Sequence, residues 1–247
     1  MAGRVKVNGQ VCDKPGTLVP PHASVELAAP ENPYTGRGGL KLEGALEDFG
    51  LTVRDLVVLD VGASTGGFTD CLLKKGACRV YALDVGYGQL AWTLRQDPRV
   101  TVMERFNVRN LKTEHLPVIP DLAVIDVSFI SLKLVLPVLR RVGLPALLAL
   151  IKPQFEAGRE LADRGRGVIR DAAVHRAVLL ELCDFACQEG YCCQGLTCSR
   201  RPGPRGNLEF FAFWKLAPQG RCFCLPDREQ LVQSVVEQGH HLLRQQK

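Results

Sequence analysis

Residues 57–68 constrain the fold of this chain more than any other segment. Their sequence, VVLDVGASTGGF, is an apolar strand that leads directly into a glycine-rich turn. Glycine has no side chain, so the backbone of such a turn can come very close to a nucleoside ligand. Apolar runs and helical periodicity alternate after this turn, and repeated βα units predict an α/β fold with a largely parallel, doubly wound sheet. The strands are expected at residues 56–61, 79–84, 100–103, 122–126 and 147–151, and the helices at 69–75, from 89 onward and at 133–141.

The segments on either side of this βα region have different patterns. Asn8-Gly9 interrupts a short alternating run and predicts a β-hairpin, followed by a short strand at residues 24–27. Helical spacing predicts a helix from Gly39 to Gly50. Further along, we expect a glycine- and arginine-rich loop at 158–167, a helix capped by Asp171 through Glu189, closing strands at 196–199 and 208–214, and an amphipathic helix from Asp227.

Composition places the chain among ordinary globular proteins. Its 247 residues are 46% hydrophobic and 23% charged, enough for one α/β domain and a small appendage. The longest uninterrupted apolar run, near residues 146–151, is too short to span a bilayer, so we expect a soluble cytoplasmic protein with no membrane partner. The ten cysteines include no Cys-x-x-Cys pair, and no metal site is expected.

Basic residues are clustered although the net charge is only +5. Clustered arginines favour a polyanionic partner such as RNA. The alternative is that they are ordinary solvated charges on loops. The candidates for RNA contact are Arg37, Arg164, Arg166, Arg170, Arg201 and Arg205.

Two classes of cofactor could use the glycine-rich turn. Asp84, at the end of the second strand, could bind ribose hydroxyls, as in dinucleotide enzymes. However, Gly62-x-x-x-Gly66-Gly67 lacks the order Gly-x-Gly-x-x-Gly, and the negative charge of Asp60 would oppose a pyrophosphate. S-adenosylmethionine carries a sulfonium, an ammonium and no phosphate, so an acidic entrance suits it better. Asn107 follows the third strand, where an adenine amino group would lie.

Four polar residues, Lys41, Asp126, Lys152 and Glu209, each follow or end an apolar run. Two lysines and two carboxylates in one cleft form an acid–base set, because one lysine can be held neutral beside the positive charge of the other. A neutral amine can take a proton from a weakly acidic hydroxyl group. The same four residues could instead form two ordinary ion pairs at strand ends.

Seven motifs extend over most of the chain: VNG at 7–9, RGGLKLE at 37–43, DVGASTGGFTD at 60–70, DVGYGQL at 84–90, IDVSFIS at 125–131, IKPQFE at 151–156 and GNLEF at 206–210. Through these motifs the chain resembles the TlyA family of ribosomal RNA 2′-O-methyltransferases, which have an FtsJ-like catalytic domain. The resemblance implies a seven-stranded, mostly parallel, class I (Rossmann-like) methyltransferase sheet and S-adenosylmethionine as the cofactor. It implies cofactor contacts at Asp60, Gly62, Ser64, Gly66, Gly67, Phe68, Asp84 and Asn107.

The resemblance also implies a division into domains. Residues 1–29 would be the truncated β portion of an αL RNA-binding domain, the type found in ribosomal small-subunit protein four. Residues 30–38 would be a linker and 39–216 the FtsJ-like methyltransferase domain. Residues 217–247 would form a tail with an amphipathic helix. Ribosomal RNA or ribosomal subunits would be the partners, with no obligate protein partner.

The resemblance assigns the catalytic tetrad to Lys41, Asp126, Lys152 and Glu209. Lys152 would be the general base that takes the ribose 2′-hydroxyl proton, Asp126 would orient it, and Lys41 and Glu209 would position the hydroxyl and balance charge. Two other functions stay open: a membrane-active haemolysin, and an RNA-binding protein whose methyltransferase domain is inactive.

Overall fold

The computed structural model describes residues 5–14, 16–27, 32–217 and 227–245, and it omits the side chains of Arg159, Ala162 and Arg164. The chain forms two compact units, Met1–Pro33 and Tyr34–Lys247. The second unit thus begins at Tyr34, inside the segment expected to be a linker. No helix among the described residues is long and apolar enough to cross a membrane.

The first unit contains a three-stranded antiparallel sheet in the order β2-β1-β3. The predicted hairpin is confirmed: Asn8 and Gly9 join β1 to β2 with φ angles of 50° and 79°, the left-handed values that a tight hairpin turn requires. The Asn8 side chain also accepts a hydrogen bond from the Ser24 backbone amide at 2.9 Å, which ties the turn to the start of β3. The strands are β1 (Val5–Val7), β2 (Gln10–Val11) and β3 (Val25–Leu27).

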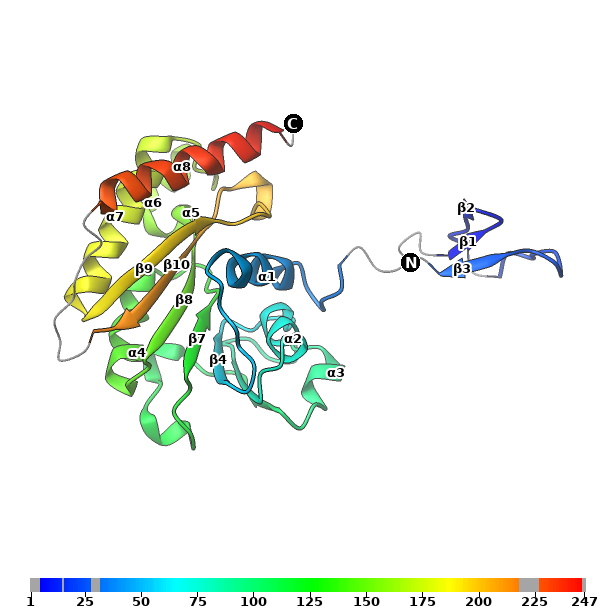
Figure 1. Cartoon of the computed structure of the whole chain (residues 1–247), viewed down its shortest axis with the longest axis horizontal. Helices are drawn as coiled ribbons and strands as arrows, with labels where there is room; N and C mark the ends of the chain where they lie inside the picture. The colour runs from blue at the N-terminus through cyan, green and yellow to red at the C-terminus, as the bar shows by residue number, and fades with distance from the viewer. Residues whose placement is uncertain (1–4, 15, 28–31, 218–226, 246–247) are drawn as a thin grey trace. The chain divides into compact units, whose positions relative to one another are not determined.

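The second unit is built on a seven-stranded sheet in the order β6-β5-β4-β7-β8-β10-β9 (Figure 1). Five strands run parallel, as the βα pattern predicts, and β10 is antiparallel to both of its neighbours. The strands are β4 (Val57–Val61), β5 (Arg79–Leu83), β6 (Val100–Met103), β7 (Leu122–Ile125), β8 (Ala146–Ile151), β9 (Tyr191–Cys198) and β10 (Phe210–Leu216).

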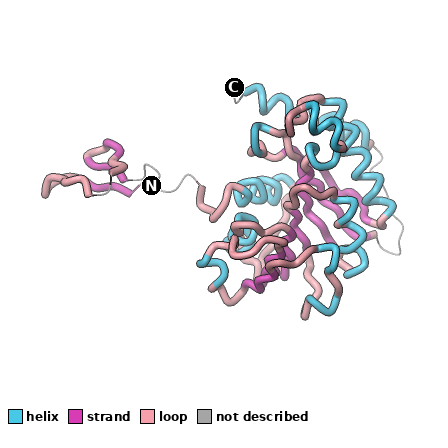
Figure 2. The backbone as a smooth tube through the Cα atoms, turned by 180° about the vertical axis from the view of Figure 1, so that it is seen from behind, coloured by secondary structure: helices cyan, strands magenta, loops and turns pink. Residues whose placement is uncertain are grey.

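Helices cover both faces of this sheet, so its strands lie between two helical layers (Figures 1 and 2). Side chains of β10 alternate between the two cores: Phe210 belongs to the core under α4, α7 and α8, and Phe211 to the core under α1, α2 and α3. A strand buried on both faces is apolar throughout, which explains the continuous run at 210–214. The helices are α1 (Gly38–Asp48), α2 (Gly67–Lys74), α3 (Trp92–Arg95), α4 (Leu136–Val142), α5 (Pro153–Glu156), α6 (Arg159–Arg164), α7 (Ala172–Gln188) and α8 (Arg228–Gln245), with 3₁₀ turns η1 (Val108–Asn110), η2 (Thr113–His115), η3 (Leu132–Leu134) and η4 (Pro204–Gly206).

Two predicted boundaries agree closely with the structure, and three predictions need correction. Asp171 caps α7 by accepting a hydrogen bond from Ala173 at 2.8 Å, as expected. The tail helix begins at Arg228, one residue after its predicted start. The segment 158–167 is not all loop, because six residues between Gly158 and Gly165 form α6. The helix expected from Gln89 is only the short α3.

The strand β9 also begins earlier than predicted, at Tyr191 and not Leu196. Gly195 interrupts the apolar run and hides the first part of the strand in the sequence. In the structure this glycine makes room for the Phe49 ring, since a Cβ atom at residue 195 would lie 2.9 Å from Phe49 Cε1. The glycine therefore serves packing within the strand and does not end it.

Candidate active site

Three of the four tetrad residues lie at one edge of the sheet because of where strands end or begin. Asp126 directly follows β7, Lys152 directly follows β8, and Glu209 directly precedes β10. Since β8 and β10 pair antiparallel with Phe210 opposite Ile151, Glu209 and Lys152 are neighbours just beyond the last pair. The antiparallel strand thus brings a carboxylate to the carboxyl edge of the parallel strands.

Helix α1 supplies the fourth residue, Lys41. Its Nζ lies 2.5 Å from Glu209 Oε2, and the two side chains are only 10% and 0% exposed. The backbone of Gly203 packs directly against the Glu209 carboxylate, since a Cβ atom at residue 203 would lie 2.0 Å from Glu209 Oε1. Lys41 and Glu209 therefore form a buried, tightly packed ion pair.

The second ion pair is more accessible. Lys152 Nζ lies 2.6 Å from Asp126 Oδ1 and donates a hydrogen bond to Ser128 Oγ at 2.9 Å. The exposed fractions of the Lys152 and Asp126 side chains are 11% and 22%. The first turn of α1 lies against this pair, because a Cβ atom at Gly38 would lie 3.8 Å from Asp126 Oδ2. The structure therefore gathers the predicted tetrad as two ion pairs at one edge of the sheet.

Beside the Lys152–Asp126 pair is a cavity of about 730 Å³, which we call the strand-edge cavity. Gly62 shapes one wall: its φ is 91°, and a Cβ atom there would lie 2.5 Å from the Asp126 carbonyl oxygen. Only glycine can occupy this position without displacing the end of β7. The lining residues are Val61, Gly62, Ser64, Leu83, Asp84, Val85, Gln89, Asn107, Val108, Arg109, Asp126, Val127, Ser128, Phe129, Ile130, Ser131 and Leu134.

Four of the eight residues expected to contact a cofactor line this cavity: Gly62, Ser64, Asp84 and Asn107. The Asp84 carboxylate accepts hydrogen bonds from the backbone amides of Ser64 at 2.8 Å and Gly86 at 2.6 Å, which joins the glycine-rich turn to the end of β5. The Asn107 side-chain oxygen accepts from the Arg109 amide at 3.0 Å and begins η1. Both side chains are thus held in fixed orientations at the wall.

Asp60, also expected to contact the cofactor, is buried and does not line the strand-edge cavity. Its side chain has no exposed surface, and Oδ2 accepts a hydrogen bond from Thr69 Oγ1 at 2.6 Å. Burial raises the pKa of this carboxyl group to about 7. Asp60 therefore holds β4 to α2, and the carboxylates that bring negative charge to the cavity are Asp84 and Asp126.

Gly66, Gly67 and Phe68 do not line the strand-edge cavity itself. Gly66, with a φ of 94°, backs onto Leu94 of α3, where a Cβ atom would lie 2.2 Å from Leu94 Cδ1. Gly67 and Phe68 line a smaller pocket of about 120 Å³, together with Arg37 and Asp126. Gly66 thus serves packing against α3, whereas the smaller pocket adjoins the strand-edge cavity, since Gly62, Ser64 and Asp126 line both.

Two aromatic residues that the sequence did not single out lie beside the tetrad. Phe129 is 91% exposed, has a φ of 63°, and lines the strand-edge cavity. Its ring centroid lies 4.9 Å from that of Phe155, which in turn lies 5.9 Å from Lys152 Nζ. The only sequence signal was their position beside Asp126 and Lys152, because exposure of an aromatic ring cannot be read from a pattern. Ser128, which the sequence did not single out either, accepts a hydrogen bond from Lys152.

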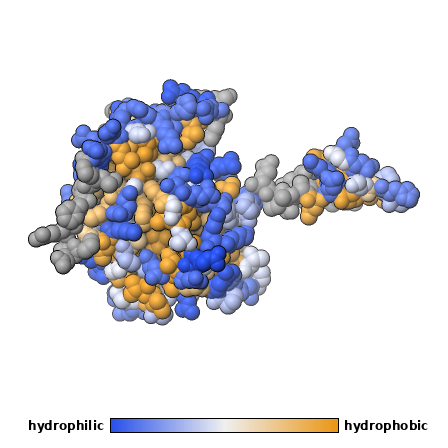
Figure 3. Space-filling view, in the orientation of Figure 1, coloured by the Kyte–Doolittle hydropathy of each residue, from blue (hydrophilic) through white to orange (hydrophobic). Residues whose placement is uncertain are grey.

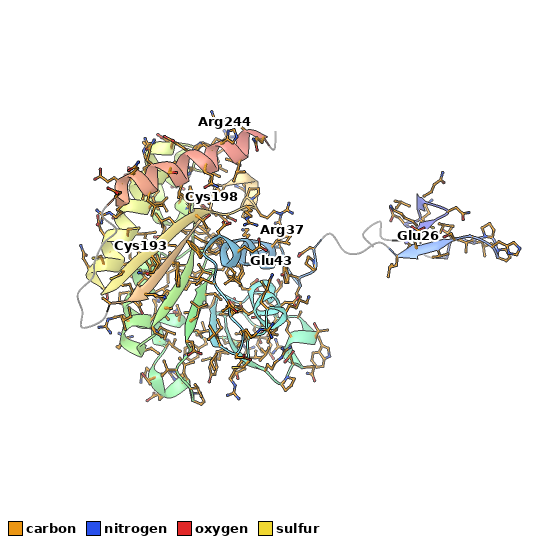
Figure 4. The ribbon with its side chains drawn as sticks, in the orientation of Figure 1. Glu26, Arg37, Glu43, Cys193, Cys198 and Arg244 are labelled. Atoms are coloured by element: carbon orange, nitrogen blue, oxygen red, sulfur yellow. The ribbon has the colours of Figure 1, made fainter. Side chains whose placement is uncertain are left out.

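The candidate RNA-binding arginines lie on loops and at helix ends of the second unit. Arg37 lies at the start of α1 (Figure 4). Arg166, Arg170, Arg201 and Arg205 belong to loops near α6, α7 and η4, and Arg205 Nη1 donates to the Arg166 carbonyl at 3.0 Å. The side chain of Arg164 lies outside the described part of the chain.

Comparison with known proteins assigns this fold and site to a family. The FtsJ-like methyltransferase family matches residues 34–216. A relative from Bacillus subtilis, provisionally named rRNA methyltransferase YqxC, is 47% identical over 100% of this chain and 88% of its own length. The 16S/23S rRNA (cytidine-2′-O)-methyltransferase TlyA of Mycobacterium tuberculosis is 41% identical over 96% of this chain and 89% of its own length.

A solved structure from Streptococcus thermophilus, provisionally described as a hemolysin, is 41% identical and has a TM-score of 0.83. The match covers 100% of this chain and 89% of that structure. The predicted class I methyltransferase sheet is thereby confirmed. The chain belongs to the FtsJ-like methyltransferase family.

Proposed function

We propose that the protein transfers a methyl group from S-adenosylmethionine to a ribose 2′-hydroxyl group of ribosomal RNA in the cytoplasm. The observation that carries the proposal is the Lys152–Asp126 pair, in which Asp126 lines the strand-edge cavity, together with the buried Lys41–Glu209 pair. The name of the M. tuberculosis relative supports ribosomal RNA as the substrate. The first unit and the candidate arginines would contribute RNA contacts.

The residues of the strand-edge cavity fit the proposed cofactor. Asp84 and Asp126 offer carboxylates to a ligand with two positive charges, and the ribose hydroxyls can donate to lone pairs of Asp84 that its two backbone partners leave free. Gly62 allows the backbone of the turn to approach closely, and Asn107 can meet the adenine edge. When bound, the cofactor supplies an electrophilic methyl carbon attached to a sulfonium.

The chain's own residues would prepare the nucleophile. Lys152 Nζ would accept the proton of the 2′-hydroxyl group, so that the oxygen could take the methyl group that the cofactor would supply and the cofactor would leave as the neutral sulfide. Asp126 and Ser128 fix the position of the amine, and the proton then passes from Lys152 to solvent. The buried Lys41–Glu209 pair would hold the site in shape.

The exposed Phe129 ring gives a reason to expect an RNA ligand at this edge. The Phe129 ring lies beside the proposed general base, and its centroid is 4.9 Å from that of Phe155. An unpaired nucleotide base can stack on such an exposed aromatic face. Stacking there would hold the ribose of the same nucleotide next to Lys152. The arrangement therefore suits an accessible nucleotide in a loop or a flipped-out position.

A lysine-to-arginine substitution tests the proposed base. Arginine keeps the positive charge but cannot lose its proton near neutral pH, so Lys152→Arg should lower single-turnover methylation of ribosomal RNA by about 10²-fold or more. Lys152→Ala should be equally inactive. Calorimetry should show S-adenosylmethionine affinity within about threefold of wild type for both variants and no comparable binding of NAD, because the proposed cofactor contacts lie on other segments.

Lys215→Arg provides the matched control, since Lys215 lies at the far end of β10 from Glu209. This control should retain wild-type activity. An active Lys152→Arg enzyme would contradict the assignment of Lys152 as the base. Absence of methylation by the wild type on ribosomal subunits and on naked ribosomal RNA would contradict the proposed function itself.

A further inference from the structure

A second large cavity lies beneath the C-terminal helix, and we call it the α8 cavity. Its volume is about 690 Å³, and none of the tetrad residues lines it. Its walls come from three parts of the second unit: α8, the start of α7, and the loop between β9 and β10. Figure 4 marks Arg244 on α8, and Figure 3 shows largely hydrophilic residues at the outer surface where this helix lies.

The polar part of this cavity is basic. Arg170, Arg205 and Arg244 come from three different segments, and within the described ranges none of them forms an ion pair. Glu237 is the acidic residue of the lining, and its Oε1 accepts a hydrogen bond from Gln233. Three guanidinium groups around one hollow favour an anion, and arginine suits phosphate by geometry as well as charge.

Apart from His240, the rest of the lining carries no polar side chain, which restricts the chemical class of the ligand. Pro202, Val236 and Leu243 form a wall beside the arginines, joined by Ala172. A free phosphate would leave this wall without a partner, whereas a nucleotide presents a flat base and a phosphate at a short distance from each other. The size of the cavity also lies within the range of small-ligand sites.

One loop connects the α8 cavity to the tetrad. Pro202 and Arg205 line the cavity, and Gly203 between them packs directly against Glu209. Asn207 holds this loop to the segment before α7, since its side chain accepts from the Ile169 amide at 3.1 Å and donates to the Gly167 carbonyl at 2.9 Å. A ligand in the α8 cavity therefore touches the same loop that supports the catalytic edge.

We propose that the α8 cavity binds a nucleotide of the substrate RNA, with its phosphate on Arg170, Arg205 and Arg244 and its base on the Pro202–Leu243 wall. The inference rests on the proposed function, because the same RNA must reach Lys152. It gives α8 a role in holding the substrate at a second point. The same chemistry could come from a free nucleotide, and the experiment separates the two sources.

The test compares RNA binding by the full-length protein with two of the cavity arginines removed. The variant Arg170→Gln/Arg244→Gln should bind a single-stranded ribosomal RNA fragment about tenfold more weakly than wild type at moderate salt. The slope of log affinity against log salt should become shallower by about 1.4, because each lost contact to single-stranded RNA removes about 0.7. Arg141→Gln/Arg140→Gln on α4 removes the same charge elsewhere and serves as the control.

A second variant tests the apolar wall. Leu243→Glu places a negative charge beside the arginines and should weaken RNA binding at least as much as the arginine variant, whereas Leu242→Glu on the same helix should have a smaller effect. Thermal melting confirms that each variant is folded. Cytidine monophosphate should compete with the RNA fragment more strongly than inorganic phosphate does.

The outcomes are distinct. Equal RNA affinity for wild type and the arginine variant, or equal loss in the α4 control, would overturn the proposal. A variant that loses binding of free cytidine monophosphate while keeping RNA affinity would show that a free nucleotide is the ligand, and would overturn it as well. If the arginine variant keeps normal methyl transfer and unchanged RNA affinity, this inference alone is refuted. If the arginine variant binds RNA more weakly than wild type but neither protein transfers a methyl group, the proposed function alone is refuted.

Discussion

At the scale of single residues, Asp60 shows how the end of a strand separates residues that are close in sequence, because Gly62 already lies in the turn that follows β4. Asp60 and Gly62 are two residues apart, yet Asp60 is buried against Thr69 and Gly62 lines the strand-edge cavity. Burial, with smaller contributions from the carboxylates of Asp126 and Asp84, raises the pKa of Asp60 from its ordinary value of 3.8 to about 7. The residue is therefore sensitive to pH although it lies outside the site.

This shift predicts a pH dependence of stability. The native carboxyl group holds a proton that the unfolded chain releases from about pH 4 upward, so the contribution of Asp60 to stability is full below about pH 4 and is lost as pH rises through about 7. Asp60→Asn keeps an acceptor for the Thr69 hydroxyl group but cannot titrate. The free energy of unfolding, measured by urea denaturation between pH 4 and 7, should fall less steeply with pH for this variant than for wild type. The two slopes should differ by up to about 1.4 kcal/mol per pH unit.

Asp121→Asn is a suitable control for this measurement, because Asp121 is exposed and accepts a hydrogen bond from the Val57 amide at the start of the same strand. Parallel pH profiles for wild type and Asp60→Asn would contradict the raised pKa of Asp60. The expected difference is independent of any ligand.

At the scale of elements, the loop between β9 and β10 carries the support for Glu209. Gly203 has an ordinary φ of −72°, so alanine is allowed there by backbone conformation, but its methyl group would lie 2.0 Å from Glu209 Oε1. Gly203→Ala should displace the Glu209 carboxylate and weaken its ion pair with Lys41. We expect single-turnover methylation to fall by about tenfold or more, with cofactor affinity unchanged in calorimetry.

Pro204→Ala in the same loop is the comparison, since Pro204 is exposed. It should retain near wild-type activity. Full activity of Gly203→Ala would show that the exact position of Glu209 is unimportant for the reaction.

The elements that could be predicted from sequence are those whose burial leaves a simple pattern. Strands such as β4 and β8 are covered on both faces, so they are continuous apolar runs, and Asp171 is a sequence-local cap. Asp126, Lys152 and Glu209 could be singled out as candidates because each adjoins such a run. The sequence could not show that Asp60 faces the core or that Phe129 is exposed, because both depend on how neighbouring strands and helices pack.

At the scale of the whole molecule, the chain combines two units that have separate internal packing. The seven-stranded sheet and both hydrophobic cores belong to the second unit, which begins at Tyr34. In its described part, the first unit contains three short strands with exposed side chains such as Leu27. All residues proposed to bind cofactor or take part in catalysis lie in the second unit.

This division predicts the behaviour of a fragment that begins at residue 34. It should fold cooperatively and bind S-adenosylmethionine with an affinity within about threefold of the full chain, because the cavity walls are complete. Its affinity for ribosomal RNA should be lower, as expected if the first unit contributes RNA contacts. Calorimetry and filter binding measure the two affinities, and undiminished RNA binding by the fragment would contradict the proposed role of the first unit.

The antiparallel strand β10 has a consequence for synthesis of the protein. Lys41 enters the growing chain early, but its partner Glu209 is made only after the strands β4 to β9 have been completed. Until β10 inserts between β8 and β9, the sheet lacks its last carboxylate and Lys41 lacks the counter-charge of Glu209. The proposed methyl transfer therefore requires that β9 and β10 have paired, because only then is Glu209 in place beside Lys41.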